Sequence, residues 1–93
     1  MSFQLVFSKK SQKEFKKLDP NIQRRIHVAI KEKLLVNPDQ YLISLAGDLK
    51  FLYKFRVGDY RLICRKEAKK LVILVVAVKH RKEVYKAISS DYL

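Results

Sequence analysis

The stretch from Tyr53 to Arg65 concentrates positive charge in a way that suits contact with phosphates. It holds one acid, Asp59. Its cations are Lys54, Arg56, Arg61 and Arg65. From residue 50 to 57 apolar and cationic side chains alternate, and this period of two predicts a strand with one cationic face. Gly58 and Asp59 supply hairpin-turn residues, after which Tyr60 to Arg65 returns as a second strand with a basic face.

A second group of candidate residues lies in KHRKEVY (79–85), where the following strand is expected to end. Arg81 and Tyr85 would be reached directly from that strand, so they could converge with the strand cations on one concave patch. Tyr85 offers a ring for base stacking and the cations offer phosphate contacts, a combination that suits single-stranded RNA. The alternative is a solvated sheet face, since basic strand edges also guard against aggregation. The further residues predicted to contact RNA are Lys50, Arg56, Arg65, Lys79 and Lys82.

Proton transfer is the other chemistry that the sequence offers, through two histidines. His80, between Lys79 and Arg81 at the predicted junction of strand and helix, could move protons near neutral pH. His27 lies at the edge of a helical apolar stripe and is interpreted as a boundary residue. The sequence has no glycine-rich phosphate loop, no HExxH motif, and too few His and Cys residues for a zinc site. We therefore expect neither a metal nor a small-molecule cofactor.

The composition favours one basic, folded domain spanning residues 1–93. Hydrophobic residues make up 48% of the chain, and 21 Lys and Arg against 9 Asp and Glu give a net charge of +12. This charge predicts a polyanionic partner, with nucleic acid or ribosomal RNA ahead of an anionic membrane surface, and a merely soluble basic protein as the alternative. Cys64, the single cysteine, is expected in the core. No apolar run is long enough for a membrane helix, and we expect a cytoplasmic protein.

The order of helix and strand signals predicts an α+β fold. Residues 3–7 form a β-prone run, and two helices follow, of which the second should extend from Asp19-Pro20 to about Val36. The stretch 41–47 is undecided between a helical turn and a loop. After the two basic strands, residues 71–78 form a continuous apolar run typical of a central strand, and a helix from Lys79 onward closes the chain. The prediction is an N-terminal strand, a helical hairpin, a three-stranded antiparallel meander and a C-terminal helix, forming a small twisted sheet packed on the helices.

The segments LAGDLKFLYKFRVGDYRLICR (45–65) and VKHRKEVYKAI (78–88), taken with this order of elements, resemble the RelE-type toxins of the RelE/ParE toxin–antitoxin superfamily. The resemblance covers nearly the whole chain and implies a RelE-like, microbial-RNase-like fold. It also implies a type II toxin that enters the ribosomal A site and cleaves mRNA there, as a metal-independent endoribonuclease that inhibits translation. The implied partners are a RelB-like antitoxin, the ribosome and mRNA.

The resemblance also implies roles for individual positions. Lys54 is similar in position to a strand lysine of the family's active site, and Arg61 to the arginine that contacts the scissile phosphate. Arg81 resembles the arginine that stabilises charge or protonates the leaving 5′ oxygen, and Tyr85 the tyrosine that stacks on or orients the nucleotide.

Leu52 departs from this family pattern, in which a second active-site lysine is expected at that position. The identity of the general base is therefore open between Lys54 and His80. Two alternatives to the ribonuclease remain within the same superfamily. One is a ParE-like inhibitor of DNA gyrase, and the other is a catalytically inactive relative that binds an antitoxin.

Overall fold

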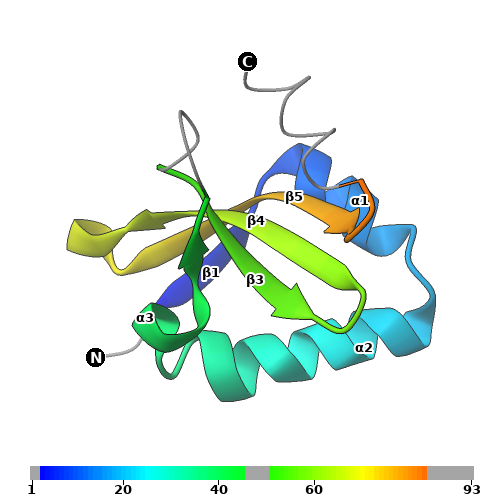
Figure 1. Ribbon diagram of the computed structural model, residues 1–93, viewed down its shortest axis with the longest axis horizontal. Coiled ribbons are helices and arrows are strands. Elements are labelled where there is room, and N and C mark those ends of the chain that lie inside the picture. The colour runs from blue at the N-terminus through cyan, green and yellow to red at the C-terminus, as the bar shows by residue number, and fades with distance from the viewer. Residues whose placement is uncertain (1–2, 46–50, 84–93) are drawn as a thin grey trace.

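The computed structural model describes residues 3–45 and 51–83, and Figure 1 shows these as a small sheet with helices against it. In chain order the elements are β1 (Gln4–Phe7), α1 (Lys9–Lys16), α2 (Pro20–Ala29), a π-helical segment (Ile30–Leu34), α3 (Pro38–Tyr41), β2 (Ile43–Ser44), β3 (Tyr53–Val57), β4 (Tyr60–Glu67), a 3₁₀ turn (Ala68–Lys70) and β5 (Val72–His80). The predicted α+β class, with a sheet packed on helices, is confirmed.

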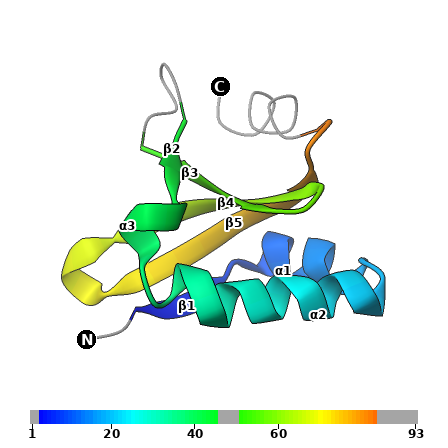
Figure 2. The same cartoon turned by 60° about the horizontal axis from the view of Figure 1, so that its bottom comes forward.

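The described strands form one mixed sheet in the order β1-β5-β4-β3-β2. β1 runs parallel to β5, and the other neighbours are antiparallel, so β3, β4 and β5 form the predicted meander. α1 and α2 lie on one side of the sheet, as Figure 2 shows. Neither helix covers the opposite face of β3 and β4, which we call the open face.

Local capping residues determine where the two helices begin. Ser8 precedes α1, and its Oγ accepts a hydrogen bond from the Ser11 backbone N at 3.1 Å. Asp19 precedes α2, and its Oδ1 accepts a hydrogen bond from the Asn21 backbone N at 2.8 Å. Pro20 occupies the first helical turn, where its missing N–H has no intrahelical partner to lose. The helical hairpin therefore follows from signals that lie within the sequence itself.

The main core fills the space between the helices and the sheet. Its side chains come from the inner faces of the helical layer and from alternate positions of the strands. The buried members are Ile26, Ile30, Leu34, Leu42, Phe55, Val57, Leu62, Cys64, Ile73, Val75 and Val78. Cys64 is among them, as predicted, and burial raises the pKa of its thiol to about 12. The thiol therefore stays protonated at neutral pH and packs as a small apolar group.

A smaller apolar cluster lies on the open face of the sheet. Its buried members are Leu45, Leu52, Ile63, Val76 and Ala77. β5 contributes to this cluster and to the main core, which confirms that its continuous apolar run is buried on both faces. The pairing of β5 with β4 contains a β-bulge, because Ile63 pairs with Ala77 whereas Cys64 pairs with Val75. Val76 is therefore one extra residue on the β5 side.

α1 takes the place of β1 along the second half of β5. The pairing with β1 ends at Val75. The carboxylate of Glu14, on α1, then accepts a hydrogen bond from the Val78 backbone N at 3.0 Å. The buried hydroxyl of Ser11 donates to the Val75 carbonyl oxygen at 2.7 Å. Glu14 thus satisfies the Val78 N–H at this strand edge, and Ser11 gives the Val75 carbonyl oxygen a second hydrogen bond beside the one from the Ser8 backbone N.

The end of β5 differs from the sequence-based expectation. The strand continues to His80, so Lys79 and His80 belong to the ladder and do not begin a helix. His80 pairs with Tyr60, at the start of β4, and this pairing keeps the chain extended up to the neighbouring turn. Arg81 follows in a turn formed by residues 81–83. The predicted C-terminal helix falls on residues 84–93, outside the described residues.

Three other boundaries differ from the prediction. α2 ends at Ala29 and is continued by the π-helical segment to Leu34. The undecided stretch 41–47 begins at the last residue of α3 and contains the short strand β2, which pairs with β3. β3 begins at Tyr53, and Phe51 before it is 53% exposed although alternation placed it with the buried side chains. The pairing of β2 with β3 joins two separate segments of the chain, which alternation along one strand does not encode.

Removing the Ser11 hydroxyl should weaken the join between α1 and β5. Ser11→Ala is expected to lower the free energy of unfolding by about 1 kcal/mol, the usual net contribution of one hydrogen bond. Urea denaturation would measure the change. Gln12→Ala, at an exposed position of the same helix, is the matched control. Equal stability of the two variants would contradict the importance of this bond.

Candidate nucleic-acid interface

Three cations form a row across the open face, here called the cation row. Arg56 on β3 pairs with Arg61 on β4, and Arg61 pairs with Lys79 on β5. Directly paired residues project from the same face of a sheet, with Cβ atoms about 5 Å apart. Like charges at this spacing repel each other, and an anion placed over them would relieve that repulsion. The cation row is therefore suited to phosphate.

Lys54 and Arg65 extend this positive surface along the strands. Lys54 lies two residues before Arg56 and pairs with Ile63, a member of the open-face cluster. Arg65 lies two residues after Ile63 on β4. Alternation along each strand therefore places both cations on the open face. The predicted site residues that share this face are Lys54, Arg56, Arg61, Arg65 and Lys79.

The turn between β3 and β4 contacts both Arg61 and Arg81. Arg61 Nη1 donates hydrogen bonds to the carbonyl oxygens of Gly58 and Tyr60, both at 2.9 Å. Arg81 N donates to the Asp59 carbonyl oxygen at 2.8 Å, and Arg81 Nε lies 3.7 Å from Asp59 Oδ1. Gly58 has a φ of +57°, which glycine adopts without steric cost. Both arginines are thus anchored to adjacent residues of one tight turn.

His80 projects from the opposite side of the sheet. Its ring meets that of Tyr60 edge to face, with the ring centroids 5.5 Å apart. Its Nδ1 accepts a hydrogen bond from the Lys82 backbone N at 3.3 Å. Because Tyr60 and His80 pair on one face while Arg61 and Lys79 pair on the other, the structure does not bring His80 to Lys54.

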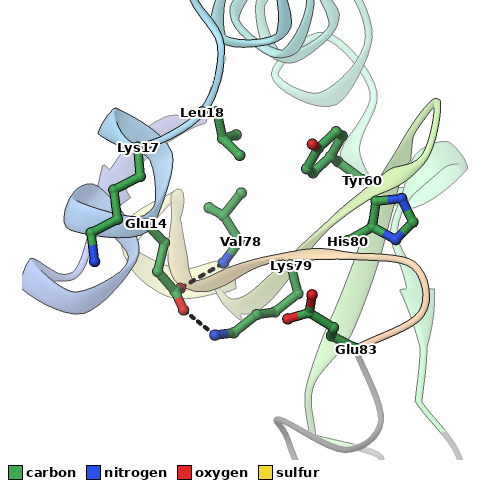
Figure 3. Close-up of a pocket in the computed structure, with 8 residues that line it drawn as sticks. All are labelled: Glu14, Lys17, Leu18, Tyr60, Val78, Lys79, His80 and Glu83. Carbon is green, nitrogen blue, oxygen red and sulfur yellow. Dashed lines mark hydrogen bonds and ion pairs between the residues drawn. The ribbon is translucent and has the colours of Figure 1, made fainter.

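A pocket of about 460 Å³ lies beside His80, between α1 and the end of β5, and Figure 3 shows its lining. The lining residues are Glu14, Lys17, Leu18, Tyr60, Val78, Lys79, His80 and Glu83. Lys79 reaches over the sheet edge and forms an ion pair with Glu14, the same carboxylate that accepts from Val78 N. Part of the Lys79 charge is therefore neutralised, and the excess positive charge of the cation row lies on Arg56 and Arg61.

Three predicted site residues remain. Lys82 is exposed in the turn after β5, whereas Lys50 and Tyr85 lie outside the described residues, so their roles stay predictions. Asp59 contacts a predicted site residue although the sequence assigned it only to the turn. The sequence signal for Asp59 was its position as the single acid of the strongly basic stretch 53–65.

Two further properties concern residues 3–45 and 51–83 only. No group of three or more His, Cys, Asp or Glu side chains in these ranges is placed to hold a metal ion. Nor does any helix in them combine the length and the apolar character needed to cross a bilayer.

Solved toxins of toxin–antitoxin systems have a similar fold. The RelBE2 toxin–antitoxin complex from Mycobacterium tuberculosis contains a chain that matches with a TM-score of 0.81 and 22% identity, covering 87% of this chain and 100% of that one. A double mutant of the E. coli toxin RelE, in the free state, matches over 100% of both chains with a TM-score of 0.75 and 25% identity. The archaeal RelE–RelB complex from Pyrococcus horikoshii OT3 matches with a TM-score of 0.66 and 28% identity, over 87% of this chain and 97% of that one. A search of curated proteins found no significant match.

The fold and the sequence together define a toxin of type II toxin–antitoxin systems, within the RelE/ParE superfamily. Residues 5–85 match the sequence profile described as the ParE toxin of the type II toxin–antitoxin system parDE, and the chain belongs to this family. The resemblance to RelE-type toxins inferred from the sequence is confirmed by the structural matches.

Phosphate should stabilise the fold through the cation row. Pyrophosphate at about ten times its Kd is expected to add about 1.4 kcal/mol to the free energy of unfolding. This would appear as a higher Tm than in sodium chloride of equal ionic strength. Arg56→Ala and Arg61→Ala should lose most of the increment, whereas Arg24→Ala, on the exposed surface of α2, should keep it. An equal increment in all variants would contradict a specific site on the open face.

Proposed function

We propose that this toxin is a ribosome-dependent endoribonuclease that cleaves mRNA in the ribosomal A site. The observation that carries the proposal is that Arg61, a member of the cation row, and Arg81 both contact the β3–β4 turn. In the proposed complex these two guanidinium groups would bind one phosphate, beside a surface that can follow the RNA backbone. Guanidinium forks match phosphate oxygens in geometry and carry charge at every relevant pH.

The proposed reaction is transfer of the scissile phosphate to the neighbouring 2′ oxygen. The 2′-OH loses its proton to a general base, the 2′ oxygen attacks phosphorus, and the bond from phosphorus to the 5′ oxygen breaks. The products are a 2′,3′-cyclic phosphate and a 5′-OH, whose oxygen takes up a proton. Arg61 and Arg81 would stabilise the extra negative charge of the pentavalent intermediate, and neither step requires a metal.

Lys54 is the better-placed candidate for the general base. It projects from the same face as Arg61, whereas His80 projects from the other. Tyr85 would stack on the nucleotide, as the family resemblance implies. Ribosomal RNA would bend the message so that the 2′ oxygen, phosphorus and 5′ oxygen lie in line, and activity on free RNA should therefore be weak.

The proposed macromolecular partners follow from charge and from the similar structures. The net charge of +12 favours the ribosome and mRNA as targets and an acidic antitoxin as the inhibitor. The similar toxins from M. tuberculosis and P. horikoshii were solved in complexes with antitoxins. A RelB-like antitoxin covering the open face would block the site. Toxin action would take place in the cytoplasm, where ribosomes work.

A gyrase inhibitor is the second candidate, and two observations favour it. The matching family profile is that of ParE toxins. Leu52, where the family resemblance predicts a second active-site lysine, is fully buried in the open-face cluster. A lysine at this position would have to leave the cluster or bury its charge. A catalytically inactive, antitoxin-binding relative would share the same departure.

Loss of either site arginine should slow cleavage strongly. Arg61→Ala and Arg81→Ala are each expected to reduce the single-turnover rate by about 100-fold, the scale of losing one donor to a developing anion. The measurement is the rate at which new RNA ends appear on programmed ribosomes in a reconstituted translation system. Arg24→Ala, an arginine of the helical layer, is the matched control.

The purified toxin, tested in the translation system and with purified gyrase, distinguishes the candidate functions. Cuts at A-site codons that depend on Arg61 and Arg81 support the ribonuclease. Intact message together with inhibited supercoiling by purified gyrase would establish the second candidate. Intact message and active gyrase would leave an antitoxin-binding protein without either activity.

A further inference from the structure

We infer that Asp59 and His80 are positioning residues, which hold Arg81 against the β3–β4 turn, the same turn whose carbonyl oxygens bind the Arg61 guanidinium. This inference rests on the proposed function, because it concerns how Arg81 is presented to a phosphate. It assigns His80 a part in the site without a proton transfer. It also gives Asp59, the single acid of residues 53–65, a function beyond forming the turn.

The first contacts fix the backbone around Arg81. Arg81 N donates to the Asp59 carbonyl oxygen at 2.8 Å, which ties the end of β5 to the β3–β4 turn. The next two backbone N–H groups both donate to His80: Lys82 N to Nδ1 at 3.3 Å, and Glu83 N to the carbonyl oxygen at 2.8 Å. The backbone N–H groups of residues 81–83 are therefore bound by Asp59 and His80 and not by helical hydrogen bonds.

The second contact orients the side chain of Arg81. Nε is the guanidinium atom that approaches Asp59 Oδ1, at 3.7 Å, so the Nη end extends past the carboxylate. The two side chains are 55% and 64% exposed, and an exposed pair of this kind contributes little to stability. We therefore assign the pair a local role in positioning Arg81 and not a role in stabilising the fold. Because Nε faces Asp59, the two Nη groups stay available for a forked contact with phosphate.

The His80 ring is itself held in place from the main core. It contacts Tyr60 edge to face, and Tyr60 packs against the buried residues of the main core. A ring fixed in this way can present Nδ1 as an acceptor only if that nitrogen carries no proton. Since Lys54 and Arg61 lie on the other face, the Nδ1 contact with Lys82 connects His80 to the site through the backbone and not through substrate.

Two replacements of His80 distinguish positioning from acid–base catalysis. Asparagine places an acceptor oxygen near the position of Nδ1, whereas glutamine places its amide near the position of Nε2. His80→Asn should keep the cleavage rate within about threefold. His80→Gln should lower kcat about tenfold, because the Arg81 side chain would be slightly displaced, and should change the half-saturating ribosome concentration little. Equal losses in both variants would overturn the assignment.

Asp59→Asn tests the carboxylate, and a double variant tests whether both residues act through Arg81. Asp59→Asn should lower kcat about tenfold, while Asp39→Asn, an acid-to-amide change on α3 beside Lys66, should leave it unchanged. In an Arg81→Ala background, His80→Gln and Asp59→Asn should cause no further loss, because the group that they orient is absent. Additive losses in that background would overturn the proposal.

A measurement without RNA separates this inference from the proposed function. Amide hydrogen exchange at Arg81, Lys82 and Glu83 in the full-length free toxin should be faster in His80→Gln than in the wild type, and close to wild type in His80→Asn. Unchanged exchange in His80→Gln would overturn the positioning role even where RNA is cleaved. If the wild type cuts no message, the proposed function fails, and exchange still decides whether His80 holds this turn.

Discussion

The structure depends on the burial of β5, a strand that must satisfy apolar side chains on two faces and backbone groups on two edges. The helical layer covers one face and the open-face cluster covers the other. On one edge β5 pairs with β4. On the other edge its backbone groups form hydrogen bonds first with β1 and then with side chains of α1. Ser11 and Glu14 are therefore as much a part of the sheet as the strand residues that they contact.

The same constraint explains why the positive charge gathers where it does. With one face of the sheet against the helices, the cations that alternate with core residues on β3 and β4 have only the open face left. Their direct pairing places Arg56 against Arg61, an arrangement that weakens an isolated sheet. The fold tolerates this repulsion because the main core lies beneath it. The repulsion between the paired cations and the proposed affinity for a polyanion thus have the same structural origin.

Much of the fold could be predicted because its signals are local. The Asp19-Pro20 helix start, the Gly58-Asp59 turn and the alternation around Phe55 each depend on a few adjacent residues. The faces of β3 and β4 followed from that alternation, and with them the grouping of Lys54, Arg56 and Arg61. The short strand β2 and the π-helical segment could not be predicted in the same way, because they depend on neighbours far along the chain or on small changes in helical hydrogen bonding.

The sheet face on which His80 lies could not be predicted from the sequence. A continuous apolar run such as LVILVVAV has no alternation, so it does not reveal which face each side chain occupies. Nor does it reveal that the strand continues through Lys79 and His80. Both facts depend on the pairing of β5 with β4, and the residues of β5 alone do not indicate this pairing. The assignment of His80 to proton transfer therefore rested on its neighbours in the chain and not on its face of the sheet.

The extra residue at Val76 determines the parity of everything that follows it in β5. Counted from Val75 with strict alternation, Lys79 would face the helices and His80 would project from the open face. The single inserted residue reverses that order. As a result Val78 packs in the main core and Lys79 pairs with Arg61 in the cation row. The β-bulge in this uniformly hydrophobic run thus determines that, at the end of β5, the cation Lys79 lies on one face of the sheet and the imidazole of His80 on the other.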